Sequence, residues 1–372
     1  MGLEAALSMK RCSNKVMSAE AAVASCVLDG TSLSVATFCN SSPYALIHEV
    51  IRQRKKDLTL LNQSCFEEMD LLVAGGCARR MISAYVSKAG IASETPITRA
   101  LRNGTLEIEE YSNFTYAAML QAGAHGLPFG IVSPAIIHSD IFRKRTFAGE
   151  DKFRVIKCPY SGKDVVTVPP LTPDVAIVHA QRADAFGNTQ FWGTPGSNKM
   201  AAMAAKRIIV SVEEVVDSSV VKGSYQYTML PGFMVDAVVP EPFGAHPAEV
   251  MGYYRYDKFF RGQIWAQFSD AQRTQDLLEE WIFGVKDRNE YLQRFALRFG
   301  PTELERLRTH PTPSDSVRVG TLAEPLFDET GYSRLFDLSR DEMISLLEAG
   351  PDSLRDSRDV LSTGKEGASS GH

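Results

Sequence analysis

The sequence contains no apolar run of about 18 residues, roughly the length that a helix needs to cross a membrane. Its N-terminus lacks the apolar core of a secretory signal. The six cysteines form no CxxC pair and show no metal-finger spacing, which favours a reducing, cytoplasmic compartment. No grouping of His, Asp and Glu has metal-ligand spacing either. We therefore expect neither membrane contact nor a metal centre.

The chain also lacks an excess of positive charge. Its 372 residues carry a net charge of −5, and the notable basic clusters are short, at residues 52–56 and 143–145. Such a distribution argues against nucleic-acid binding, which requires a broad basic surface. The hydrophobic share of 44% supports a sizeable core in one large or two ordinary domains.

Within residues 102–130 the spacing of the apolar residues changes twice, on either side of a short polar segment. We call this segment, residues 111–113, the corner. From 105 to 110 apolar and charged residues alternate, which predicts a half-buried strand. Residues 114–124 have helical spacing, and Ser112 or Asn113 is suited to cap that helix. Open α/β sheets bind ligands at such corners, because backbone N–H groups and the helix dipole point outward there. The candidate ligand-binding residues are Tyr111, Ser112 and Asn113, although a role as helix cap alone explains Asn113 equally well.

Short apolar runs and helical stretches alternate along the rest of the chain. Strands are expected at 31–38, 58–62, 71–74, 81–86, 175–179, 207–213 and 234–239, and helices at 18–27, 44–54 and 198–206. Gly75 and Gly76 end the run at 71–74 with a backbone that is free to approach a ligand. Residues 144–168 are more polar and predict a hairpin that turns at Ser161-Gly162. This order predicts an α/β fold with an open, mostly parallel sheet and helices on both faces.

The composition changes near each end of the chain. We expect a flexible lead-in at 1–17, an α/β domain at 18–268, a helical extension at 269–349 and a disordered tail at 350–372. The extension should contain a helix capped by Ser269 or Asp270, a second over 290–298, and a last one that a capping box at 339–342 opens. Because long helical additions commonly cover subunit contacts, we expect this extension to serve assembly.

Short motifs occur in a fixed order between about residues 28 and 260. They are Asp29-Gly30, ALIHE at 45–49, VAGG at 73–76, RMISAYV at 80–86, GTLEIEEYSN at 104–113, AGAHGLP at 122–128, PDVAIVH at 173–179, Asp184 with Gly187-Asn188, Val235-Asp236 and GAH at 244–246. Together they resemble the A (alpha) subunit of family I coenzyme A transferases, in particular the glutaconate CoA-transferase branch. The resemblance implies the same open α/β fold.

The resemblance also implies a mechanism and a partner. In this family a glutamate attacks an acyl-CoA, and an acyl-glutamyl anhydride and then a glutamyl-CoA thioester form. In two-subunit members that glutamate generally belongs to the B subunit. We therefore expect the partner to be a B (beta) subunit in a heterotetramer or larger assembly. We also expect an acyl-CoA and a carboxylic acid to be the substrates. The coenzyme A thioester is thus a substrate, and we expect no permanently bound cofactor.

Individual residues take roles from the resemblance. Asn113 aligns with an amide side chain that suits an oxyanion or a substrate carboxylate. Further substrate-binding candidates are Ser83, Gly75, Gly76, Tyr111, Ser112 and His246, and His246 and His179 are possible bases. Each has a structural alternative: Ser83 can satisfy a neighbouring backbone group, and a lone histidine is more often hydrogen-bonded within the fold. The in-chain fallback nucleophiles are Glu107, Glu109 and Glu110, for which alternation alone predicts a solvated strand face.

Three other functions stay open at this point. Related subunits belong to ring-opening acyl-CoA hydrolases and to decarboxylases of the glutaconyl-CoA type, although the hydrolases carry a glutamate near position 113. An inactive ligand-binding paralogue is the non-enzyme alternative. It is favoured by the loop at 37–42, which reads TFCNSS where the family has a glycine-rich turn.

Overall fold

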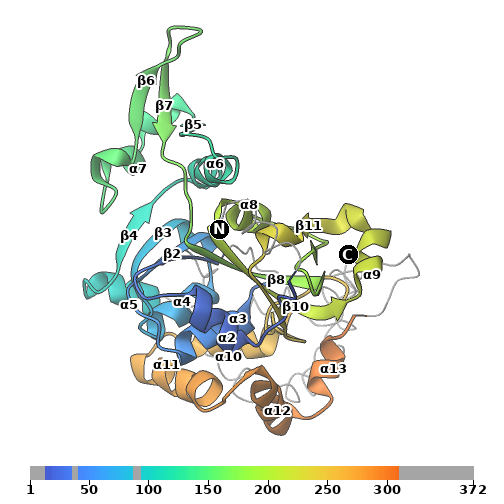
Figure 1. The fold of residues 1–372 in the computed structure, drawn as a ribbon. Coiled ribbons are helices and arrows are strands. Elements are labelled where there is room, and N and C mark those ends of the chain that lie inside the picture. Colours follow the sequence, from blue (N-terminus) through green and yellow to red (C-terminus); the bar gives the residue numbers. More distant parts are fainter. Residues whose placement is uncertain (1–12, 36–40, 87–93, 310–372) are drawn as a thin grey trace, which may run out of the picture.

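The computed structural model describes residues 13–35, 41–86 and 94–309. Its centre is a nine-stranded sheet (Figure 1). In the order β12-β10-β8-β1-β2-β3-β4 all neighbours pair in parallel, and β9 and β11 add antiparallel pairs beside the end of β8. The strands are β1 (Ser32–Val35), β2 (Leu58–Cys65), β3 (Ala78–Val86), β4 (Glu107–Glu110), β8 (Val175–Asp184), β9 (Thr189–Gln190), β10 (Arg207–Val216), β11 (Thr228–Leu230) and β12 (Ala237–Pro240).

Helices cover both faces of the sheet, as predicted. On one face lie α2 (Ala19–Cys26), α3 (Tyr44–Arg52), α4 (Glu67–Ala74) and α5 (Pro96–Arg102), and on the other α6 (Asn113–Ala124) and α8 (Asn198–Ala204). Helix α9 (Ser218–Gly223) follows β10. The alternation of strand residues decides the faces, since Leu60 packs into the first core and Leu61 into the second.

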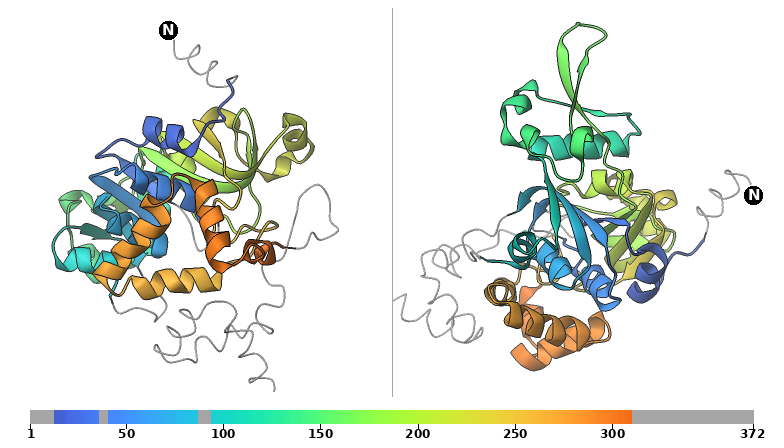
Figure 2. Two further views of the ribbon diagram at one scale, coloured as in Figure 1. Left: turned by 90° about the horizontal axis from the view of Figure 1, so that it is seen from below. Right: turned by 90° about the vertical axis from the view of Figure 1, so that its left-hand side faces the viewer.

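A separate three-stranded antiparallel sheet projects beyond β4 and α6 (Figures 1 and 2). We call residues 130–168 the arm. It contains β5 (Gly130–Val132), α7 (Asp140–Arg143), β6 (Arg154–Lys157) and β7 (Asp164–Val168), with 3-10 turns at Pro134–His138 and Gly149–Asp151. The hairpin predicted at 144–168 is thereby confirmed in β6 and β7. Gly162, with a φ of 67°, lies in their turn and adopts the left-handed conformation that glycine tolerates.

The C-terminal helices form an outer layer on the side of the sheet away from the arm (Figure 2, right). They are α10 (Lys258–Gln267), α11 (Ala271–Leu278), a π-helical turn (Glu279–Phe283), α12 (Arg288–Phe299) and α13 (Glu303–Leu307). Asp270 caps α11, as one of the two predicted alternatives. Buried Trp281 and Tyr291 share one hydrophobic core with α3 and α4, so the expected boundary at 268 does not separate two cores. The helix expected from residue 339 and the tail lie outside the described residues.

Three expectations about local structure were wrong. Residues 71–74 belong to helix α4, which begins at Glu67, and not to a strand. Strand β8 runs on to Asp184, beyond the end expected at residue 179, because Gln181 and Arg182 are buried and hydrogen-bonded to Trp192 and Gln190. The last strand begins at Ala237 and not at Met234, which closes a 3-10 turn.

The described part of the lead-in is fixed to the sheet. Val16 forms a parallel bridge with Val238 in β12, and the Met17 amide donates to the Val238 carbonyl at 3.0 Å. The buried Lys15 ammonium donates to the Gly232 carbonyl at 2.5 Å. Residues 15–17 are therefore bonded to the rest of the fold, whereas a flexible lead-in was expected, and residues 1–12 lie outside the described residues. Within the described ranges, no helix is long and apolar enough to span a bilayer.

Candidate functional site

The carboxyl ends of β2, β3 and β4 meet at the predicted corner. Ser83 pairs with Glu110 in the parallel register of β3 and β4, and the Tyr111 amide donates to the Ser83 carbonyl at 2.9 Å. Directly after this bond the chain turns into α6. The strand, corner and helix predicted for residues 105–124 are thus confirmed, and the corner lies where parallel sheets bind ligands.

Ser112, and not Asn113, caps helix α6. The Ser112 hydroxyl oxygen accepts a hydrogen bond from the Thr115 amide at 3.1 Å. Asn113 is the first residue of this 12-residue helix, and its side chain is exposed. Among the described residues, no hydrogen bond to the side-chain amide of Asn113 is present. The alternative that Asn113 serves only as a cap is therefore removed.

Donor groups gather at the N-terminus of α6. The N–H groups of Asn113 and Phe114 precede the first intrahelical hydrogen bond, which Tyr116 donates to the Ser112 carbonyl at 2.9 Å. No acidic side chain lies in the first turn of the helix. These N–H groups, the helix dipole and the Asn113 amide together favour a negatively charged oxygen at the corner.

Two other predicted residues of the corner are buried. Tyr111 is 1% exposed, and its ring packs edge-on against Phe153 of the arm. Ser83 is also buried, and its hydroxyl both donates to the Tyr85 carbonyl and accepts from the Tyr85 amide at 3.2 Å. These contacts correspond to the local, backbone-satisfying alternative for Ser83.

The three glutamates of the corner have different environments. Glu109 is completely buried and forms an ion pair with Lys152, whose ammonium lies 2.6 Å from its carboxylate, so the expected solvated face is wrong for Glu109. Glu107 is exposed and pairs with Arg80 at 2.9 Å. Glu110 is exposed. Alternation alone did not reveal the burial of Glu109, because the covering residues come from the arm.

Gly75 and Gly76 lie before the start of strand β3, at the end of the strand that is away from the corner. They follow helix α4 and precede β3, whereas Ser83 lies near the other end of that strand. Ala78 and Ser83 are separated by about 16 Å, at roughly 3.3 Å per residue. Gly75 is required by packing, since a Cβ there would lie 2.7 Å from the Ile51 side chain. The structure therefore does not bring these glycines to the corner, and the error follows from the strand wrongly expected at 71–74.

His246 and His179 are both buried and hydrogen-bonded within the fold. The Nε2 atom of His246 lies 3.0 Å from Asp257 Oδ2 and its Nδ1 atom 2.8 Å from the Tyr291 hydroxyl. His179 bonds to Ser211 and Glu213. Neither imidazole has an exposed surface, which corresponds to their structural alternative. His246 lies among the C-terminal helices, away from the corner.

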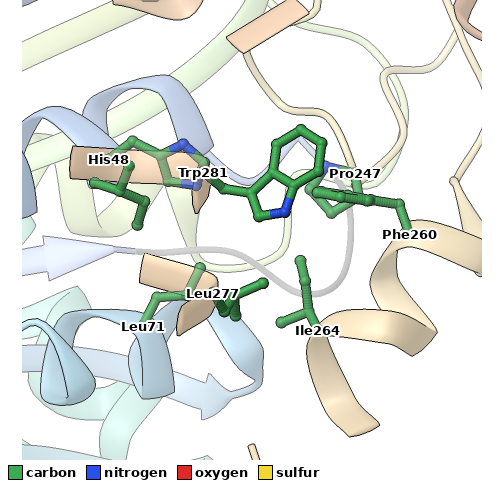
Figure 3. Close-up of a pocket in the computed structure, with 8 residues that line it drawn as sticks. His48, Leu71, Pro247, Phe260, Ile264, Leu277 and Trp281 are labelled. Carbon is green, nitrogen blue, oxygen red and sulfur yellow. The ribbon is translucent and has the colours of Figure 1, made fainter. Parts of the chain in front are cut away.

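A small cavity lies where the C-terminal helices meet α3 and α4 (Figure 3). Apolar side chains form most of its wall, including Leu277, Phe260 and Trp281, and His48 contributes the imidazole. Burial lowers the pKa of His48, and the charges of Arg288 and Arg52 lower it further. A cavity walled mostly by apolar side chains offers few donors for a carboxylate, so the corner remains the better candidate site.

Three further residues lie at the corner that the sequence did not indicate. The Gln63 amide donates to the Asn113 carbonyl at 3.3 Å. The Phe114 ring is 62% exposed beside Asn113, and Tyr85 is 46% exposed at the end of β3. The strand run expected at 58–62 ended one residue before Gln63. In the described part of the chain, no group of three His, Cys, Asp or Glu residues is suited to hold a metal ion.

Residues 16–241 match the family model for coenzyme A transferase. This match covers more than half of the 372 residues, and the chain belongs to the coenzyme A transferase family. Its relatives include A subunits. That of the 3-oxoadipate CoA-transferase of Pseudomonas knackmussii is 36% identical over 280 residues, which are 73% of this chain and 94% of that protein. That of the glutaconate CoA-transferase of Acidaminococcus fermentans is 33% identical over 314 residues, 80% of this chain and 96% of that protein.

Solved structures agree with this assignment. The crystal structure of glutaconate coenzyme A-transferase from Acidaminococcus fermentans matches with a TM-score of 0.74 and 30% identity, over 82% of this chain and 98% of that chain. A variant of the decarboxylase AibA/AibB matches with a TM-score of 0.60 and 31% identity, over 71% of this chain and 97% of that chain. The α/β fold and the family predicted from the motifs are thereby confirmed.

Proposed function

We propose that this chain is the A-type chain of a two-chain CoA-transferase that moves CoA between an acyl-CoA and a free carboxylic acid. Asn113 supplies a hydrogen-bond donor to the oxyanion or to the substrate carboxylate, and a B subunit supplies the nucleophilic glutamate. The observation that carries the proposal is the exposed Asn113 amide at the N-terminus of α6. A donor is what acyl transfer needs at this position, because each tetrahedral intermediate carries a negative oxygen.

Of the three in-chain candidates for the nucleophile, Glu109 has surroundings that argue against this role. Glu109 is occupied by the Lys152 ammonium and by two backbone amides, so it is not free to attack a thioester. Glu107 and Glu110 are exposed and remain the in-chain alternatives. The complex is a heterotetramer or larger in this proposal.

The test is covalent trapping in the assembled enzyme. The chain is co-expressed with a B-type chain, incubated with an acyl-CoA, treated with borohydride and digested for mass spectrometry. Borohydride reduces a glutamyl thioester to a primary alcohol and releases CoA as the thiol, which marks the nucleophile. We expect the mark on the partner and none in the same complex without acyl-CoA. A mark on Glu107 or Glu110 would move the nucleophile into this chain.

The second candidate is decarboxylation, which the likeness to the decarboxylase AibA/AibB favours. It predicts release of carbon dioxide and no reducible glutamyl thioester. Free acid without carbon dioxide would instead indicate a hydrolase. The chain purified alone should show negligible CoA exchange, and substantial exchange without a partner would contradict the two-chain proposal.

A further inference from the structure

Glu109 lies at the centre of a contact between β4 and the arm. Its Oε1 atom lies 2.6 Å from the Lys152 ammonium, and both side chains are 1% exposed. Its Oε2 atom accepts hydrogen bonds from the backbone amides of Thr146 and Ala148 at 2.8 and 3.0 Å. The Thr146 hydroxyl also donates to the Ile108 carbonyl at 2.6 Å. One carboxylate therefore fixes both the lysine and the loop that carries it.

Lys152 connects this contact to the corner. Its ammonium donates to the Lys144 carbonyl at 2.8 Å and lies 5.0 Å from the centre of the Tyr111 ring, a distance at which a cation and an aromatic face attract each other. Glu109 and Tyr111 lie two residues apart on β4 and its continuation, so both side chains point to the arm side. The arm thus contacts the side chains of both Glu109 and Tyr111, directly before Ser112 and Asn113.

A buried ion pair is a poor source of stability, because the loss of hydration offsets most of the attraction between its charges. It does, however, impose one geometry, since each charge must meet its partner at a fixed distance. An apolar pair would permit the arm and the strand to slide. We propose that Glu109 and Lys152 are positioning residues that fix the backbone of the 111–113 corner, and with it the Asn113 donor.

This inference rests on the proposed function for its kinetic test, which uses the two-chain complex. The variants are Glu109→Gln, Lys152→Met and the double variant, which leaves no unpaired buried charge. We expect kcat per assembled complex to fall roughly tenfold or more in all three, since small displacements of a reacting group carry large rate costs. The KM for acyl-CoA should change by much less, because a loss of positioning affects the chemical step.

The matched control is Glu150→Gln. Glu150 lies in the same loop and pairs with Arg145 at 2.5 Å, but its side chain is 92% exposed, so kcat should remain that of the parent complex. Exchange of the backbone amides of residues 111–116 with deuterium is measured in parallel. We expect these amides to exchange faster in the double variant and at an unchanged rate in Glu150→Gln. This measurement does not depend on transferase activity.

The outcomes separate the two proposals. A parent complex without CoA transfer would overturn the proposed function, and the deuterium exchange would still test the corner. Normal kcat and normal exchange in a folded double variant would overturn the positioning role. A double variant with reduced assembly but normal kcat per complex would also overturn it, because the pair would then stabilise the fold alone.

Discussion

The Nδ1 atom of His246 lies 2.8 Å from the hydroxyl oxygen of Tyr291, and this contact joins the loop after β12 to helix α12. Asp257 fixes the tautomer, because its carboxylate can only accept the proton of Nε2 at 3.0 Å. Nδ1 is therefore the acceptor, and the Tyr291 hydroxyl donates to it. Both rings are completely buried, so neither can exchange its partner for water.

Tyr291→Phe should therefore lower the free energy of unfolding by about 1–3 kcal/mol, the cost of leaving a buried acceptor without a partner. Urea unfolding followed by tryptophan fluorescence measures the change. Tyr160→Phe is the matched control, because that side chain is 98% exposed and its loss of a hydroxyl should stay within about 0.5 kcal/mol. Equal effects of the two substitutions would contradict a structural role for His246.

Asn113 offers a substitution that separates stability from activity. In Asn113→Asp the shape is kept, but a donor becomes an acceptor with a negative charge. At the N-terminus of α6 this charge should stabilise the helix by about 0.3–1 kcal/mol, while kcat should fall roughly 100-fold through loss of the donor. Thermal unfolding and the transferase assay measure the two effects, and a fully active Asn113→Asp complex would rule out the donor role.

Ser112→Ala is the counterpart on the same corner. The Ser112 hydroxyl caps α6 through the Thr115 amide, and its removal should lower stability by about 1 kcal/mol. The pair of variants thus distinguishes the cap from the donor. If Asn113→Ala were the more destabilising of the two alanine substitutions, the assignment of the cap would be wrong.

The corner was predictable from sequence because its signals are local. The alternation before residue 110 and the polar residues at 112 and 113 define a strand end and a helix start. The environment of Glu109 was not predictable, since its partner Lys152 lies in a segment whose position depends on the whole arm. Likewise, four apolar residues at 71–74 fit a strand and a helix equally well. The strand that was expected there placed Gly75 and Gly76 at the ligand-binding ends of the strands, whereas they lie at the opposite end of β3.

Glu249 gives the stability of the chain a pH dependence. Burial raises the pKa of its carboxyl from 4.5 to about 7. Because the folded pKa is the higher one, the folded state binds more protons between these values, and this group's stabilising contribution is lost as pH rises from 4.5 to 7. The loss amounts to roughly 2–3 kcal/mol for a shift of this size.

Glu249→Gln removes this titration. Relative to the parent chain, the variant should gain about 2–3 kcal/mol of stability between pH 5 and pH 8. Urea unfolding at both pH values measures the gain. Other buried groups with shifted pKa values, such as Glu241 and His48, are present in both chains and cancel in the comparison. Glu150→Gln should show no such gain, and a difference independent of pH would refute the shifted pKa of Glu249.

The C-terminal helices can be tested as part of the core by two leucine substitutions in the same layer. Leu277 on α11 is 3% exposed and lines the cavity in Figure 3, whereas Leu297 on α12 is 89% exposed. Leu277→Ala should cost about 2–5 kcal/mol, because it removes buried methyl groups and enlarges a cavity whose wall includes Leu71 of α4.

Leu297→Ala should change stability by less than about 0.5 kcal/mol. The difference between the two variants in urea unfolding measures how firmly the outer layer packs on the α/β part. If Leu277→Ala cost no more than Leu297→Ala, the helices after residue 268 would be an addition, as the composition first indicated. The large difference expected here instead means that a chain ending at 268 would lose part of the packing on α3 and α4, since Trp281, Tyr291 and Phe295 belong to the same core.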